Sequence, residues 1–161
     1  ANAAKFAPLS INPFKLSATL LNEYHRLHLI RSAITGENNL RASAVEFNLP
    51  RPSYTIDTLA YLKEKYPGHE FSILMGSDGF QNLHKWKNFE VIVKNHPIII
   101  YKRPGFEIQE THGAAIRVLD APLLEISSTH IRDLIKKKKS IRFLVPDIVK
   151  EEIETGAYYR N

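Results

Sequence analysis

Residues 126–132, Ile-Ser-Ser-Thr-His-Ile-Arg, place three hydroxyl side chains and an arginine at the predicted start of a helix. Ser and Thr oxygens accept the backbone N–H groups that the first turn of a helix leaves unpaired. The same N–H groups, with the positive end of the helix dipole, form a favourable site for phosphate. Arg132 lies within this first turn, where its planar guanidinium can hold phosphate oxygens in bidentate fashion. Ser128, Thr129 and Arg132 are therefore candidate phosphate ligands; a capped helix with a surface arginine is the plainer alternative.

A carboxylate is predicted at the end of a buried strand, in the segment Gly76-Ser77-Asp78. A carboxylate at such a strand end can accept hydrogen bonds from ribose hydroxyls, and Gly76 permits a close approach of the backbone to a ligand. The alternative is an ordinary turn with a helix-capping aspartate. Gly76 and Asp78 are candidate nucleotide ligands.

Trp86 is the only tryptophan and lies among Lys85, Lys87 and Asn88. This setting is too polar for a well-buried core position, although a lone tryptophan more often belongs to a core. An exposed indole can stack on a heteroaromatic ring. Trp86 is therefore a candidate platform for such a ring.

The elements that must position these residues alternate between strands and helices, which favours a mostly parallel sheet flanked by helices. Ligands of such sheets bind beyond the carboxyl ends of the strands. Lys15, Thr55, Asp78, Arg103 and Ser128 each follow a predicted strand, so we expect them to converge on one pocket. The sequence predicts an extended segment at 5–10, strands at 45–49, 71–75, 98–101 and 117–119, and helices at 20–34, 56–66, 89–94, from about 129 to 136, and 148–155.

The composition is that of an ordinary globular protein, with 43% hydrophobic and 24% charged residues in a chain of 161. We expect a single domain over residues 1–161. The chain has no cysteine, so it has neither a disulfide nor a thiolate metal site. No apolar run reaches membrane-spanning length and no signal peptide is evident, which makes a cytoplasmic location the expectation.

The net charge of +5 suits a phosphate-bearing partner. Lys136–Lys139 invites a nucleic-acid interpretation, but no aromatic residues interleave with the lysines to stack on bases. A solvated helix end, where cations meet the negative end of the dipole, is the better interpretation. His25 and His28 have no evident third ligand, so no metal site is predicted.

Taken together, these segments resemble the nucleotidyltransferases, and in particular the nicotinate mononucleotide adenylyltransferases. Residues 126–132 match the family's Ile-Ser-Ser-Thr-x-x-Arg signature, residues 52–55 its Pro-Ser-Tyr-Thr stretch, and residues 12–15 a loop that delivers a basic residue near substrate phosphate. The resemblance extends from Phe6 to Tyr159. It implies a Rossmann-like α/β fold and adenylyl transfer from ATP to nicotinate mononucleotide, which yields deamido-NAD and pyrophosphate in NAD biosynthesis.

The resemblance also assigns roles to the candidate residues. Mg²⁺ would accompany ATP, and Trp86 would pack on the nicotinate ring while the helix start at Thr55 receives the nicotinate carboxylate. The ATP ligands would be Ser128, Thr129, Arg132, Gly76 and Asp78, and the mononucleotide ligands would be Thr55, Trp86, Lys15 and Arg103.

One family element is missing from the printed chain: the glycine-rich loop with His-x-Gly-His that follows the first strand. The sequence begins near the expected second strand, so we expect the central strand to be missing, its neighbours to have open edges, and the chain to self-associate as a homo-oligomer. No catalytic residue is therefore assigned. Residues 1–161 alone are expected to show little adenylyl transfer. The alternatives are a non-catalytic nucleotide-binding module, a truncated inactive fragment, or an adenylyltransferase acting on phosphopantetheine, against which Trp86 and residues 53–55 argue.

Overall fold

A computed structural model describes residues 4–6, 21–122 and 125–160 of the chain. The contacts divide it into two compact units, one of residues 1–53 and 126–161 and the other of residues 54–125. The expectation of a single domain over residues 1–161 stays a prediction.

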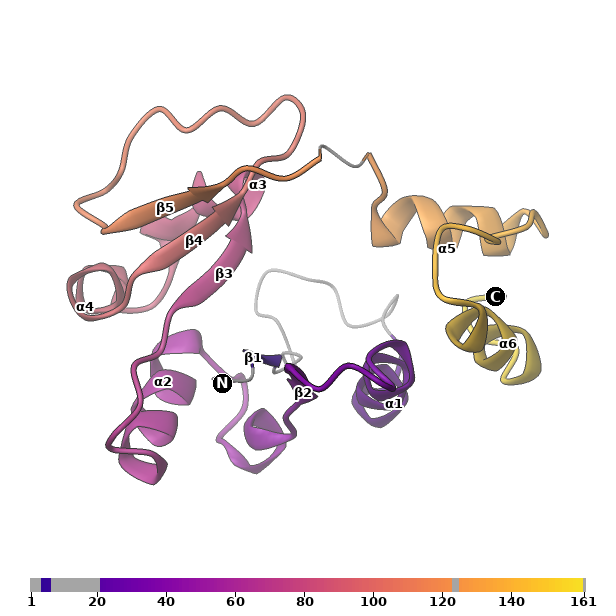
Figure 1. The fold of residues 1–161 in the computed structure, drawn as a ribbon, viewed down its shortest axis with the longest axis horizontal. Coiled ribbons are helices and arrows are strands. Elements are labelled where there is room, and N and C mark those ends of the chain that lie inside the picture. Colours follow the sequence, from indigo (N-terminus) through magenta and orange to yellow (C-terminus); the bar gives the residue numbers. More distant parts are fainter. Residues whose placement is uncertain (1–3, 7–20, 123–124, 161) are drawn as a thin grey trace. The chain divides into compact units, whose positions relative to one another are not determined.

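The second unit is built on a three-stranded parallel sheet in the order β3-β4-β5 (Figure 1). In its register Ile73 pairs with Ile98, which pairs with Ile116, so the three strands end at the same level. The strands are β3 (Ile73–Gly76), β4 (Ile98–Tyr101) and β5 (Ile116–Leu119). The helices are α2 (Thr55–Lys65), α3 (Ser77–Phe80), the 3-10 turn η3 (Leu83–Lys85) and α4 (Phe89–Asn95).

The core of this unit lies on the central strand β4. Ile98 and Ile100 point to the same face and are fully buried against Phe80 and Leu83. Burial of each large aliphatic side chain contributes about 1.5–3 kcal/mol. This packing anchors α3 and η3, which directly follow β3, onto the sheet.

The first unit contains a two-stranded parallel sheet, β1 (Ala4–Phe6) with β2 (Leu40–Ala42). Its core is formed by Ile135, Ile141, Val149 and Ile153. Its helices are α1 (Glu23–Ala33), the 3-10 turn η2 (Val45–Asn48), α5 (Ser128–Lys136) and α6 (Asp147–Thr155).

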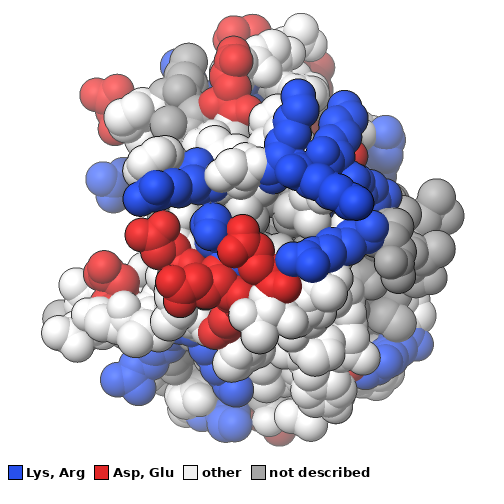
Figure 2. Space-filling view, turned by 90° about the vertical axis from the view of Figure 1, so that its right-hand side faces the viewer, with Lys and Arg blue, Asp and Glu red and all other residues white. Residues whose placement is uncertain are grey.

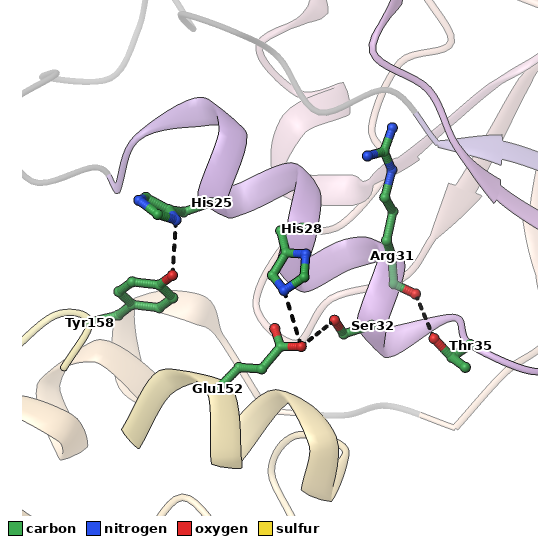
Figure 3. Close-up of polar contacts among 7 residues, drawn as sticks. All are labelled: His25, His28, Arg31, Ser32, Thr35, Glu152 and Tyr158. Carbon is green, nitrogen blue, oxygen red and sulfur yellow. Dashed lines mark hydrogen bonds and ion pairs between the residues drawn. The ribbon is translucent and has the colours of Figure 1, made fainter. Parts of the chain in front are cut away.

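Polar contacts join α1 to α6 and to the residues that follow α6 (Figure 3). Ser32 donates a hydrogen bond of 2.6 Å to Glu152 Oε1, and His28 Nε2 lies 3.2 Å from the same oxygen. The Tyr158 hydroxyl is 2.9 Å from His25 Nδ1. These contacts fix the residues after α6 against α1.

The α/β architecture with parallel strands is confirmed, and it takes the form of two parallel sheets. The strand predicted at 45–49 is wrong, because these residues form η2 after the strand β2. Ser43 Oγ accepts the N–H of Val45 at 3.3 Å, which favours a turn, and Glu46 is buried where the alternation predicts exposure. Alternation over five residues cannot separate a strand from such a turn.

If the central strand is missing, as predicted, the strands next to its place should have unpaired edges. Among the described residues, no strand pairs with the edge of β3 that faces away from β4, and Leu74 on this strand is exposed. Self-association through this edge stays a prediction. None of the helices in the described ranges is long and apolar enough to cross a membrane.

The end of α5 generates a stability prediction. The backbone N–H of Lys139 donates a hydrogen bond of 2.9 Å to the carbonyl of Leu134, and that of Lys138 donates one of 2.9 Å to the carbonyl of Ile135. Lys138 has a positive φ of 55°. Glycine is the favoured residue at this left-handed position. Lys138→Gly should raise the free energy of unfolding by about 0.5–1 kcal/mol, because the relieved strain exceeds the added unfolded-state entropy.

Urea unfolding of Lys138→Gly measures this effect, with Lys137→Gly as the matched control. Lys137 has an ordinary φ of −81°, so glycine there should be destabilising. Equal destabilisation by both substitutions would contradict the strained position of Lys138.

Candidate functional site

The start of α5 is an uncovered helix end. Ser127 Oγ accepts the N–H of His130 at 3.1 Å, so Ser127 caps the helix and Ser128 and Thr129 belong to its first turn. Both side chains are exposed. A helix leaves its first N–H groups without helical partners, and the cap satisfies one of them. The remaining groups suit an anion.

Arg132 is held across this first turn. Its Nη2 donates a hydrogen bond of 3.2 Å to Thr129 Oγ1, and its guanidinium carbon lies 6.0 Å from the centre of the Tyr159 ring. The side chain is half-buried. The positive charge of Arg132 is thus placed beside the uncovered N–H groups of α5.

Tyr159 lies in a cationic environment. Burial raises the pKa of Tyr159 above its usual value, and the positive charges of Arg132 and Arg26 act in the opposite direction. An ordinary tyrosine is already neutral in the physiological range, so a raised pKa keeps the Tyr159 hydroxyl neutral there.

In the second unit, the residues after β3 and β4 meet at the carboxyl end of the sheet. Ser77 Oγ is fully buried and accepts the backbone N–H of Arg103 at 2.9 Å. Arg103 Nε is 3.8 Å from Asp78 Oδ1, and both side chains are partly exposed. A side chain at Gly76 would collide with the Asp78 carboxylate and would lie 3.0 Å from Arg103 Cδ. Glycine is therefore required for this close approach.

Trp86 follows η3 and is half-buried, with part of its ring packed against the core around Ile98 and Ile100. Trp86 is thus not well buried, as its polar neighbours predict, although its ring is not fully exposed either. The flanking Lys85 and Lys87 contact Asn82 and Asp57. The indole between them therefore lies between the core and the surface. A half-buried ring can still offer its accessible part to a ligand.

The segment that carries Trp86 is tied to the start of α2. Lys87 Nζ is 3.0 Å from Asp57 Oδ2 and lies 4.6 Å from the centre of the Tyr54 ring. Asp57 stands in the first turn of α2, where Thr55 is the first helical residue. The contacts of Lys87 therefore keep the segment after η3 next to the helix start at Thr55.

The lysines at the end of α5 are exposed, as predicted for a solvated helix end. Figure 2 views the molecule from the side on which Figure 1 draws α5 and α6, and shows Lys and Arg side chains beside a group of acidic ones. In the described part of the chain, no three or more His, Asp or Glu side chains are grouped as metal ligands. A metal ion held mainly by substrate phosphates needs no such group.

The structure thus brings Gly76, Asp78 and Arg103 together in one unit, and Thr129 and Arg132 together in the other. Thr55 follows η2 and not the predicted strand, whereas Lys15 lies outside the described residues. Two contributors were not predicted, Ser77 and Tyr159. The sequence placed three hydroxyl residues at the helix start as possible caps, and Ser127 is the one that caps. No local signal connects Tyr159 with Arg132, 27 positions earlier.

A family model described as cytidylyltransferase-like matches residues 6–134. A protein of Flavobacterium johnsoniae named probable nicotinate-nucleotide adenylyltransferase is 45% identical over 152 residues, which cover 92% of this chain and 79% of the relative. A protein of Bacillus licheniformis with the same name is 34% identical over 154 residues, or 96% of this chain and 80% of the relative.

Among solved structures, the nicotinic acid mononucleotide adenylyltransferase of Plasmodium falciparum, complexed with NaAD, aligns with a TM-score of 0.81 at 19% identity. The alignment covers 98% of this chain and 82% of that one, and it shows a shared fold. The chain therefore belongs to the cytidylyltransferase-like family and, within it, to the enzymes named nicotinate-nucleotide adenylyltransferases.

The close approach at Gly76 generates a prediction for this family member. Gly76→Ala should weaken ATP binding about tenfold or more, because the added methyl group displaces Asp78 and Arg103 and costs a charge-assisted contact. Isothermal titration with ATP measures the change. Gly79→Ala is the matched control, since its methyl group would meet only the flexible Met75 side chain, at 3.3 Å. Equal losses in both variants would argue against a special role for Gly76.

Proposed function

We propose that this protein transfers the adenylyl group of ATP to nicotinate mononucleotide and releases pyrophosphate and deamido-NAD. The family membership supports this reaction, as do the relatives that carry the name of the enzyme at 43–45% identity. Such a reaction needs residues that bind phosphate and an aromatic platform for the nicotinate ring.

The observation that carries the proposal is the position of Arg132 one turn after the start of α5, from where its side chain reaches back to Thr129. The residue is half-buried, and its guanidinium is held by Thr129 and Tyr159 near the exposed hydroxyls at the helix start. A plain surface arginine would have neither constraint. An arginine so restrained loses less freedom when it binds phosphate oxygens.

The proposed chemistry is an in-line displacement at phosphorus. An oxygen of the mononucleotide phosphate attacks the α-phosphorus of ATP, a new P–O bond forms, and the bond to the bridging oxygen breaks so that pyrophosphate leaves with the electron pair. Ser128, Thr129 and Arg132 hold the ATP phosphates and stabilise the leaving pyrophosphate. No covalent enzyme intermediate is required, because positioning and electrostatic stabilisation supply the rate enhancement.

The remaining candidate residues bind the other parts of the substrates. The Asp78 carboxylate, next to Gly76, accepts hydrogen bonds from a ribose. The start of α2 at Thr55 receives the nicotinate carboxylate, the accessible part of Trp86 packs on the pyridine ring, and Lys15 and Arg103 lie near substrate phosphate. The contacts of Lys87 with Asp57 and Tyr54 support this assignment, because they hold the Trp86 segment near Thr55.

The proposal includes Mg²⁺ as the metal that enters with ATP and neutralises phosphate charge. One or two protein carboxylates are sufficient for a metal bound in this way. We also propose a cytoplasmic location, substrates limited to nucleotides with no nucleic-acid partner, and a homo-oligomer.

The direct test is an assay of pyrophosphate release from ATP with three acceptors, in the full-length protein. Release should require nicotinate mononucleotide, with nicotinamide mononucleotide and phosphopantetheine as the comparison acceptors. Preference for phosphopantetheine would overturn the substrate assignment. ATP binding without release for any acceptor would instead identify a non-catalytic nucleotide-binding module.

Trp86 generates a prediction about substrate choice. Trp86→Ala should weaken nicotinate mononucleotide binding by about 1–3 kcal/mol, the value of a lost stacking contact, and leave ATP binding within a factor of about two. Because Trp86 is the sole tryptophan, its fluorescence in the unmodified protein should respond to the mononucleotide and not to ATP.

Trp86→Phe is the matched control for the core packing of this residue, and thermal unfolding of both variants separates stability from binding. Trp86→Phe should retain most of the affinity, because a smaller aromatic ring can still stack. Equal loss of affinity for the two substrates in Trp86→Ala would show that Trp86 serves the core alone.

A further inference from the structure

The residues after α6 turn back onto the core of the first unit. Ala157 and Tyr159 both have positive φ angles, of 51° and 61°, and the helix ends at Gly156. A side chain at Gly156 would lie 2.6 Å from the Tyr158 ring and 3.0 Å from the carbonyl of Glu152. This tight turn presses two adjacent tyrosines, Tyr158 and Tyr159, against the cluster around Ile135 and Ile153.

The two tyrosines contact different helices. Tyr158 contacts α1 through His25, as Figure 3 shows, with a ring-centre distance of 5.0 Å. Tyr159 contacts α5 through Arg132, whose guanidinium carbon is 6.0 Å from the ring centre. Both rings are half-buried, so they differ in their partners and not in their burial.

The contact of Tyr159 constrains the side chain that the proposed function assigns to phosphate. The four flexible torsions of an arginine are costly to order on binding. Thr129 accepts a 3.2 Å hydrogen bond from the guanidinium, and the Tyr159 ring contacts the same group as a cation–π partner. Two such contacts restrict Arg132 before any ligand arrives.

The charge state of Tyr159 suits its contact with the Arg132 guanidinium. Burial raises the pKa of Tyr159, so that the residue faces Arg132 as a ring and not as a phenolate. A phenolate would pair with the guanidinium and compete with phosphate for it. A neutral ring leaves the N–H groups of Arg132 available to an anion.

We propose that Tyr159 is a positioning residue for ATP, which holds the Arg132 guanidinium in the orientation that binds the phosphates. This inference rests on the proposed function, in which Arg132 binds ATP phosphate. It makes the turn after α6 part of the ATP site.

The test compares Tyr159 with its neighbour in the full-length protein. Tyr159→Met and Tyr159→Leu, made in parallel so that the test does not depend on one variant folding, remove the aromatic face. Each should raise the KM for ATP about three- to tenfold, as expected for loss of a partly desolvated cation–π contact. The KM for nicotinate mononucleotide should stay within about twofold, and Tyr159→Phe should restore most of the ATP affinity.

Tyr158→Leu is the matched control, because Tyr158 is equally half-buried and packs on the same cluster without contacting Arg132. A merely structural role for the turn predicts the same KM change for Tyr158→Leu and Tyr159→Leu, and that outcome would overturn the proposal. So would a Tyr159→Phe variant as impaired as Tyr159→Leu.

A double-mutant cycle tests whether Tyr159 acts on ATP binding through Arg132. In an Arg132→Ala background, Tyr159→Leu should cause no further loss of ATP affinity, since residues that act through one another are not additive. Additive losses would overturn the proposal. The four ATP affinities of this double-mutant cycle can be measured by titration, without turnover. A protein that binds ATP but transfers no adenylyl group would refute the proposed function. The coupling between Tyr159 and Arg132 would still be measurable in that protein.

Discussion

The first turn of α5 has backbone N–H groups that no helical carbonyl can satisfy, and the proposed binding of phosphate depends on keeping that turn uncovered. The apolar side of the helix makes this possible. Ile135 is buried with Ile141, Val149 and Ile153, so the helix is fixed by its side while its N-terminus stays exposed. Ser127 caps a single N–H group. Within the described residues, the helix end therefore combines a fixed position with N–H groups that the Ser127 cap does not engage.

A second constraint is the parallel register of β3 and β4. Gly76 pairs with Tyr101, so the residues that follow the two strands leave the sheet at the same level. Asp78 and Arg103 meet there because of this register and the buried hydrogen bond from the Arg103 N–H to Ser77. The buried isoleucines of β4 hold the register, since a shift by one residue would turn them to the opposite face.

Trp86 packs on a core, and the proposed function gives the same side chain a ligand as well. Its flanking lysines predict exposure, whereas the ring packs partly on the core of the second unit. The polar partners of Lys85 and Lys87 explain the difference: Lys85 donates to Asn82 at 2.7 Å and Lys87 to Asp57, so these lysines remain at the surface while the indole between them turns inward. The residue thereby gains a fixed orientation that a fully exposed ring would lack.

Local patterns in the sequence determined most of the elements, including β4 at 98–101 and α5, because strand and helix periodicities are set by neighbouring residues. They also determined the candidate ligands Ser128, Thr129, Arg132, Gly76 and Asp78 by type and spacing. Only the tertiary structure decided that 45–49 is a turn around a buried Glu46, that Lys87 pairs with Asp57, and that Tyr159 lies against Arg132. The last two contacts join residues 30 and 27 positions apart, and such long-range contacts leave no period in the sequence.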